Sequence, residues 1–338
     1  MRSYLARRWF LLLVTIGLTM SLVWPDFMRP LVAWVPTQAV VAGALFLTAW
    51  SLESRRLLRA CTRPGPVLLA LAVSYGFLPL SAWLSGWLVS SPDIGVGLLV
   101  MAAVPCTMAT AVLWTRMAGG NEATALLIVL LSTVIGPLAA PAWLSLIGSA
   151  DAGLSTGKMM FDLAVVLLIP VGLAQGSRAI PAVALAATHW RTTTSVIGRL
   201  LILTIMLKTA VEVARYLPGL TPGLLLSAAV TSFAVHTAAL FLGYFGGKAL
   251  RFERGDSIAI AFAGSQKTLP VALYLYQSYY VDKYPLAVLP LALIHVGQLL
   301  VDTLAADRLA PAPVENEIRV CQEPEDSTDG VGTGSGEG

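Results

Sequence analysis

The chain has 338 residues, of which 57% are hydrophobic and only 12% are charged. Soluble domains carry about 25% charged residues, so this composition excludes an ordinary soluble protein and indicates an integral membrane protein. The net charge is only +3, and the three cysteines show neither metal-ligand spacing nor an obvious pair, so we expect no zinc site and no disulfide framework. The sequence has no phosphate-binding loop, catalytic constellation or nucleic-acid-binding stretch, which points away from an enzyme.

Apolar segments long enough to cross a bilayer recur along the chain. A spanning helix needs about 20 mainly apolar residues, and ten segments meet this requirement: residues 8–25, 34–52, 66–88, 94–117, 122–148, 158–177, 195–216, 221–246, 256–279 and 285–305. The first segment follows three arginines like a signal peptide, but it ends in Trp24-Pro25-Asp26 rather than a small-residue cleavage site, so we interpret it as a retained helix. The sequence therefore predicts an all-α integral membrane protein with about ten transmembrane helices.

The basic residues collect in alternate connections between these segments. Lys and Arg mark cytoplasmic loops, and every even-numbered connection is basic, whereas each odd-numbered one holds at most one cation. We therefore expect both termini to be cytoplasmic, in a plasma (inner) membrane of bacterial type. Residues 1–310 form the predicted ten-helix membrane domain. Residues 311–338 are rich in Glu, Asp, Gly, Ser and Pro and almost lack large apolar residues, which predicts a disordered cytoplasmic tail.

Two of the predicted helices carry polar interruptions near their middle. Residues 105–110 read PCTMAT in the fourth helix, and residues 264–270 read GSQKTLP in the ninth. If the helices form two repeats, over about 8–148 and about 158–305, each break lies in the fourth helix of its repeat. Paired breaks at matching positions indicate a transporter's binding site. Lys267 adds to this indication, because a lysine at bilayer depth costs at least about 2.5–3.5 kcal/mol. A proline kink that only adjusts packing is the alternative for the fourth helix.

Three motifs carry a resemblance to a known family. The fourth helix runs into TRMAGGNEATA (115–125), the ninth carries GSQKTLP, and the tenth reads HVGQLLVDT (295–303). These resemble the bile acid:sodium symporter superfamily, specifically the SBF-like branch that includes member 7 of solute carrier family 10, and the resemblance covers residues 5–308. It implies two inverted five-helix repeats, arranged as a panel domain and a core domain, in which the broken fourth and ninth helices cross beside ion and substrate sites.

The resemblance carries sodium chemistry over poorly. The positions that match polar ligands of the sodium-coupled branch hold other residues: Ala111, Val112, Ala125, Val129, Ala261 in place of a glutamate, and, near the helix-three glutamine, Ser74. A vestigial sodium site near Ser265 and Gln266 is what remains, so sodium stays open as a coupling ion and no metal site is predicted. We interpret Lys267 as placing its ammonium where the relatives hold a cation. Proton coupling through this lysine, and a lysine permanently paired with backbone carbonyls or an acid, are the alternatives.

These features together predict a secondary transporter that moves a small organic anion by alternating access, with weak or no sodium coupling. The alternative is a non-transporting membrane regulator with the same fold. The expected partners are the anion and the lipid bilayer, and neither the identity of the anion nor the oligomeric state follows from the sequence. The residues expected to form the substrate and ion site are Thr107, Thr110, Ser265, Gln266, Lys267, Thr268, Ser74, Ser132, Thr133 and Glu122.

Five polar side chains, Glu122 among them, also allow a structural interpretation. Glu122 lies at the start of the fifth helix, where an acid favours the helix N-terminus, so capping is the alternative to a site role. His236 and His295 are too isolated to be interpreted as metal ligands. Asp162 and Asp302 lie near the ends of their helices, and we expect them to be interfacial anchors rather than proton relays.

Overall fold

The computed structural model describes residues 9–51, 64–89, 91–145, 155–214, 218 and 220–310. Within these ranges the chain is helical and contains no strand. The predicted disordered tail, 311–338, lies outside the described residues.

The helices follow one another with few interruptions. In chain order they are α2 (Trp9–Val23), α3 (Pro25–Val32), α4 (Thr37–Trp50), α6 (Pro64–Ala72), the π-helix η2 (Val73–Phe77), α7 (Leu78–Gly86), α8 (Pro92–Ala103), α9 (Met108–Met117), α10 (Glu122–Ser145), α11 (Thr156–Ser177), α12 (Pro181–His189), α13 (Arg191–Ala214), α14 (Pro222–Ala249), α15 (Arg254–Ser265), α16 (Leu269–Leu275), the π-helix η4 (Tyr276–Tyr280), the 3₁₀-helix η5 (Pro285–Ala287) and α17 (Val288–Leu309).

Most of the predicted spans are recovered as long apolar helices. In the described ranges, seven helices are long and apolar enough to cross a membrane, and α3 with α4 forms an eighth if the two, bent by 71°, are one span. The helix α2 has 15 residues, and α8 and α9 have 12 and 10, so these are too short to pass the same test. The all-α membrane class is confirmed, whereas the count of ten spans stays a prediction.

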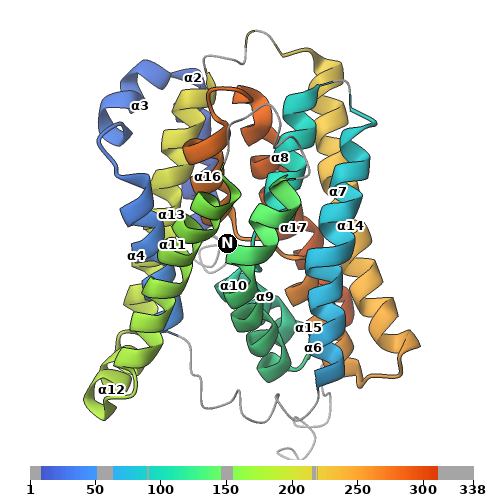
Figure 1. The fold of residues 1–338 in the computed structure, drawn as a ribbon. Helices are drawn as coiled ribbons and strands as arrows, with labels where there is room; N and C mark the ends of the chain where they lie inside the picture. The colour runs from blue at the N-terminus through green and yellow to red at the C-terminus, as the bar shows by residue number, and fades with distance from the viewer. Residues whose placement is uncertain are drawn as a thin grey trace, which may run out of the picture.

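The helices form two packed groups (Figure 1). In the first, drawn in blue and yellow-green, α4 packs against α11 and α13, and α13 also packs against α2 and α3. In the second, α14 packs against α15 and α17, α7 against α8, and α10 against α15. Each group combines helices from both halves of the chain, at matching positions in the predicted order. This arrangement is what a panel and a core would require, while the division into two inverted repeats stays a prediction.

The second group encloses the most polar of the long helices. In the span Arg254–Tyr280, which contains the GSQKTLP segment, all of the most apolar 18-residue window is buried inside the protein. Close backbone approaches support this packing. A Cβ built on Gly97 of α8 would lie 2.0 Å from the carbonyl oxygen of Ala287 in η5, so only glycine allows the two backbones to meet there. The polar break in the span Arg254–Tyr280 is therefore surrounded by protein and not by lipid.

Candidate transport site

The two polar breaks lie against each other. The first separates α8 from α9 over residues 104–107, and the second separates α15 from α16 over residues 266–268. The backbone N–H of Thr268 donates to the carbonyl oxygen of Pro105 at 3.0 Å, which joins the two breaks directly. A broken helix in a membrane is tolerated where protein satisfies its freed backbone groups, and here each break supplies a partner for the other. The prediction of two broken, crossing helices is confirmed.

Lys267 is fully buried at this crossing, and its ammonium has three oxygen partners. The Nζ atom donates to the carbonyl and the hydroxyl oxygen of Ser74, both at 2.8 Å, and to the carbonyl oxygen of Val104 at 2.9 Å. An ammonium has three N–H donors, so all of them are used. The Tyr75 ring centroid lies 4.8 Å from Nζ, within the range of a cation–π contact. Both Ser74 and Tyr75 belong to the π-helix η2, a form that is frequent at functional sites.

The backbone of Lys267 is held by an amide of α17. The Lys267 N–H donates to Oε1 of Gln298 at 3.1 Å, and Nε2 of Gln298 donates to the Lys267 carbonyl at 3.1 Å. The same Nε2 lies 3.2 Å from Nδ1 of His295. The break therefore keeps one defined backbone conformation, because a single side chain satisfies both its N–H and its C=O.

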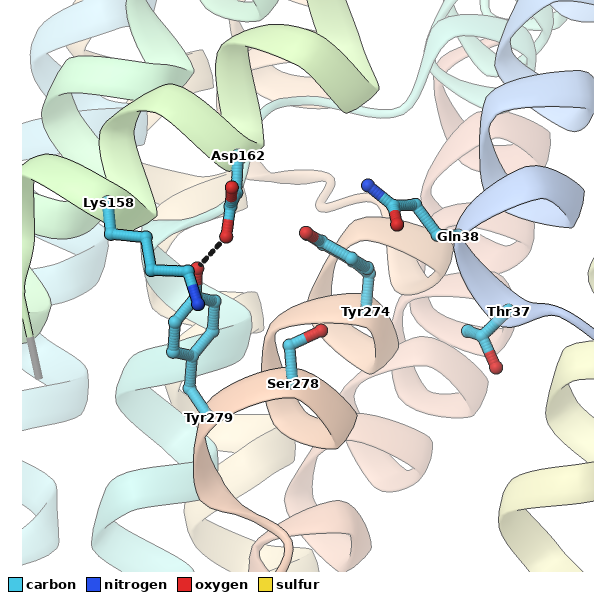
Figure 2. Close-up of a pocket in the computed structure, with 7 residues that line it drawn as sticks. All are labelled: Thr37, Gln38, Lys158, Asp162, Tyr274, Ser278 and Tyr279. Carbon is cyan, nitrogen blue, oxygen red and sulfur yellow. Dashed lines mark hydrogen bonds between the residues drawn. The ribbon is translucent and has the colours of Figure 1, made fainter.

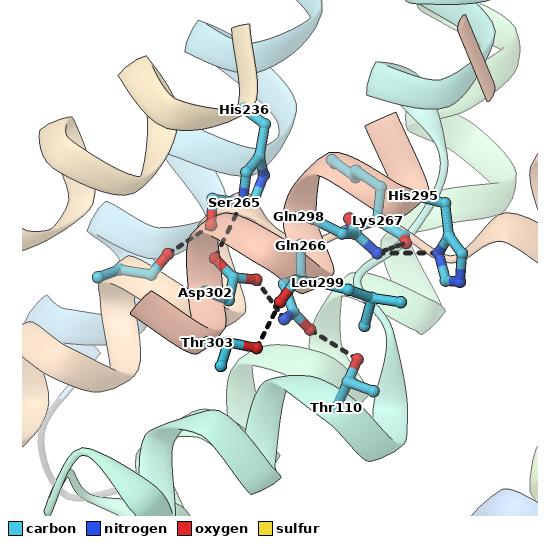
Figure 3. Close-up of polar contacts among 11 residues, drawn as sticks. Thr110, His236, Ser265, Gln266, Lys267, His295, Gln298, Leu299, Asp302 and Thr303 are labelled. Carbon is cyan, nitrogen blue, oxygen red and sulfur yellow. Dashed lines mark hydrogen bonds and ion pairs between the residues drawn. The ribbon is translucent and has the colours of Figure 1, made fainter. Parts of the chain in front are cut away.

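Gln266 connects the crossing to a buried acid (Figure 3). Its Nε2 donates to Oδ2 of Asp302 at 2.5 Å, and its Oε1 accepts from the hydroxyl of Thr110 at 2.8 Å. The other oxygen of Asp302, Oδ1, lies 3.0 Å from Nε2 of His236, and both side chains are almost fully buried. The Thr110 hydroxyl also lies 3.3 Å from that of Thr107. This chain of contacts ties α9, α14 and α17 to the second break.

The first break is tied to α10 and α15. The N–H of Cys106 donates to Oγ of Ser132 at 3.0 Å, and its thiol donates to the Ala263 carbonyl at 2.7 Å. Tyr75 donates its hydroxyl to the Ser132 carbonyl at 2.5 Å. The Ser265 hydroxyl instead donates to the Ala261 carbonyl of its own helix at 2.7 Å. Ser132 therefore contacts the first break, through Cys106, and not the second.

The predicted site residues fall into two sets. Eight surround the crossing and are connected to it directly or through one neighbour: Ser74, Thr107, Thr110, Ser132, Ser265, Gln266, Lys267 and Thr268. Thr133 bonds the Val129 carbonyl within α10 at 2.8 Å. Glu122 lies ten residues before Ser132 on α10, about 15 Å away along the helix axis, and accepts from Arg116 at 2.5 Å. A part for Glu122 in binding stays a prediction.

The GGNEA motif joins two helix ends. Oδ1 of Asn121 accepts from the N–H groups of Ala123 and Thr124, as an N-cap residue does, and its Nδ2 donates to Oδ1 of Asp256 at 2.7 Å. Thr124 donates its hydroxyl to the same oxygen at 2.8 Å, and the Asn121 N–H donates to the Gly255 carbonyl at 2.9 Å. The motif therefore fixes the start of α10 against the start of α15, which positions the helix that carries the second break.

Sequence reasoning missed three partners of the crossing. His236 and Asp302 were expected to be an isolated histidine and an interfacial anchor, and Gln298 received no assignment, yet all three are buried beside the second break. One signal was available. His295, Gln298 and Asp302 follow each other at spacings of three and four, which places them on one face of a helix.

A cavity of about 460 Å³ lies between the two helix groups (Figure 2). Its lining residues come from α4, α11, α16 and η4 and are Thr37, Gln38, Lys158, Asp162, Tyr274, Ser278 and Tyr279. Within it, the Tyr279 hydroxyl donates to Oδ2 of Asp162 at 2.5 Å. The basic-loop pattern predicts that this end of the bundle faces away from the cytoplasm.

The side chains and oxygen atoms around the crossing determine which ions could bind there. Among the residues that the structure describes, no three His, Cys, Asp or Glu side chains come together in a way that could hold a metal ion. Sodium prefers oxygen ligands, and the oxygens of Ser74 and Val104 are of that kind. These oxygens accept from the Lys267 ammonium.

The sequence of the chain is similar to those of several transporters. The family model described as the SBF-like CPA transporter family matches residues 8–311. The uncharacterized protein YbaS of Bacillus subtilis is 26% identical over 278 residues, which cover 81% of this chain and 86% of that protein. The putative symporter YfeH of Escherichia coli is 29% identical over 64% of this chain and 66% of its own. The probable sodium/metabolite cotransporter BASS4 of Arabidopsis thaliana, a chloroplast protein, is 26% identical over 63% of this chain and 51% of its own.

Proposed function

Because the chain belongs to the SBF-like CPA transporter family, we propose that it moves a small organic anion across the membrane by alternating access, and that Lys267 takes the place of a transported cation. Sodium coupling is then weak or absent. The proposal differs on this point from the name of the Arabidopsis relative, which includes sodium.

The position of the Lys267 ammonium is the observation that carries the proposal. Its three acceptors are two carbonyl oxygens and one hydroxyl oxygen at 2.8–2.9 Å, all neutral, and they belong to η2 and to the first break. A free sodium ion at this point would need the same oxygens. Because the chain supplies the positive charge, the partial negative charges of these carbonyls are compensated without an ion from solution.

The substitutions around the crossing support the same proposal. Ala111, Ala125, Val129 and Ala261 are all fully or almost fully buried, and none of them has a side-chain oxygen. The family resemblance implies that the sodium-coupled branch has oxygen ligands at these positions. The absence of one oxygen ligand would be weak evidence. The absence of several ligands for a cation, together with the added positive charge of Lys267, is what replacement of a bound cation by a side chain requires.

Alternating access is favoured by the cavity between the two helix groups. Transporters of this kind rock one helix bundle against the other around a site at their interface. The cavity takes its lining from α4 and α11 of the first group and from α16 and η4, which continue the chain from α15 of the second group. A regulator that only kept the fold would need neither this cavity nor the polar side chains at both breaks, which is why we favour transport.

The test is uptake by the purified full chain in lipid vesicles. A panel of labelled organic anions is offered in sodium chloride and in choline chloride of equal ionic strength. We expect uptake of at least one anion, at the same rate in both salts. A strong sodium dependence would overturn the replacement of the cation by Lys267, and failure of every anion to enter would favour the non-transporting regulator.

A further inference from the structure

Every residue that lines the cavity between the helix groups has a polar side chain. The seven residues come from α4, α11, α16 and η4 and contribute two aliphatic hydroxyl groups, one amide, two phenol hydroxyl groups, one ammonium and one carboxylate (Figure 2). Pockets for amphipathic ligands are lined mainly by apolar and aromatic carbon. A cavity of about 460 Å³ with this lining is suited to a small, strongly polar molecule.

Two opposite charges lie in the cavity without pairing with each other. Lys158 and Asp162 are four residues apart on α11, so they lie on one face of the helix, about 5–6 Å apart at Cβ. Asp162 accepts from the Tyr279 hydroxyl at 2.5 Å and not from Lys158. Among the described residues, the Lys158 ammonium has neither a hydrogen-bond acceptor nor an ion-pair partner, and Asp162 Oδ1 receives no hydrogen bond. Each charge is therefore available to a ligand.

We propose that this cavity binds a small zwitterion, whose carboxylate pairs with Lys158 and whose ammonium pairs with Asp162. This rests on the proposed transport function and changes its substrate class from a net anion to a zwitterion, in which the carboxylate is kept and an ammonium group is added. A pure anion would pair with Lys158 but would place a second negative charge beside Asp162, and like charges in contact oppose binding. A ligand with both groups compensates both charges of the cavity.

The bound zwitterion would touch both helix groups. Its charges pair with α11, while the hydroxyl groups of Tyr274 and Ser278 face it from the other group. Tyr274 lies on α16, which begins two residues after Lys267. Occupancy of the cavity is thus connected through one short helix to the crossing of the breaks, and a ligand that binds one arrangement of the groups better than the other shifts their equilibrium.

The experiment compares matched probes on the purified full chain. Alanine and β-alanine are the zwitterions, propanoate is the same acid without the ammonium, and ethylamine is the amine without the carboxylate. Binding is measured as the concentration at which each probe raises the unfolding temperature in detergent. For the wild-type protein we expect either or both zwitterions to bind at least about tenfold more tightly than propanoate, the factor for a charge pair with the half-buried Asp162. We expect them to bind about threefold to fivefold more tightly than ethylamine, because the pair with Lys158 is exposed.

Two variants and two matched controls make the test specific. Asp162→Asn keeps an acceptor for Tyr279 but removes the charge, so the preference for the zwitterions over propanoate should fall to about twofold or reverse. Lys158→Gln should weaken binding of both zwitterions and propanoate by about threefold to fivefold, as for an exposed ion pair. The controls Asp282→Asn and Lys283→Gln change the same charges at exposed positions of the same end, outside the cavity, and should keep the wild-type preference.

Three results would overturn the proposal: neither zwitterion binds the wild-type protein, propanoate binds as tightly as they do, or Asp162→Asn leaves the preference unchanged. If Asp162→Asn fails to fold, the wild-type ratio and Lys158→Gln, whose side chain is exposed, still decide the question. These measurements do not involve Lys267 or sodium. Sodium-independent uptake of an organic anion would therefore leave the proposed function standing even where the zwitterion proposal fails.

Discussion

Replacement of Lys267 by alanine should create a sodium site where the wild-type protein has none. The substitution removes an ammonium that donates three hydrogen bonds at 2.8–2.9 Å and leaves the oxygens of Ser74 and Val104, both fully buried, without a donor. Removing one partner of a buried charged arrangement costs about 3–5 kcal/mol of stability. The shorter side chain also leaves room for an ion among oxygens of the type that sodium prefers.

Sodium should return part of the lost stability to Lys267→Ala. A ligand that binds only the folded state at ten times its Kd adds about 1.4 kcal/mol. The measurement is the unfolding temperature of the purified protein in detergent, in sodium chloride and in choline chloride at equal ionic strength. We expect the variant to unfold at a higher temperature in sodium than in choline, and the wild-type protein to unfold at the same temperature in both salts.

Lys208→Ala is the matched control for this experiment. Lys208 also donates to a carbonyl and a hydroxyl oxygen, those of Val35 and Thr37 at 2.8 and 3.3 Å, but it lies on α13, outside the crossing. Its replacement should cost stability without creating a response to sodium. The reasoning is refuted if Lys267→Ala is indifferent to sodium, or if sodium stabilises the wild-type protein as much as the variant.

The remaining predictions concern topology and packing. In a background without native thiols, a cysteine at Lys248 should be protected from an impermeant thiol reagent added outside intact cells, and one at Asp282 should react; the opposite pattern would refute the cytoplasmic placement of the termini. Gly97→Ala should lower stability by about 1–3 kcal/mol or more, because its Cβ would overlap a backbone carbonyl of η5. The control Gly172→Ala, with nothing within 4 Å of its Cβ, should change the unfolding temperature little.

The sequence was sufficient to predict the membrane class and the two breaks. Apolar length and the placement of cations depend on local composition, so spans can be read from the chain in order. The breaks were predictable because Pro105 and the run from Ser265 to Thr268 lie within apolar segments. Proline frees backbone polar groups and the run adds polar side chains, and neither can face lipid without hydrogen-bond partners. The contact between the breaks followed from the family resemblance, and the structure confirms it.

The partners of the breaks could not be predicted in the same way. Asp302 and His236 are 66 positions apart, and nothing in either helix says which of its faces meets the other. The distribution of apolar residues around these helices does not show which face packs against protein, because in a membrane both the lipid side and the protein side are apolar. The π-helix η2, which presents Ser74 to Lys267, was likewise not predicted, and in the structure it packs against α8, α14 and α15.

If Lys267 replaces a transported cation, as proposed above, its tethered ammonium has a thermodynamic consequence for the direction of transport. A sodium ion that travels with the substrate releases the free energy of its own gradient on each crossing, and its occupancy falls when the external concentration falls. A side-chain cation is present at the same effective concentration on every cycle, and it never leaves the protein, so it contributes no net work. A carrier that exchanges no other ion brings its substrate only to the electrochemical equilibrium of that substrate. Such a carrier would move its substrate in whichever direction the electrochemical gradient of that substrate points.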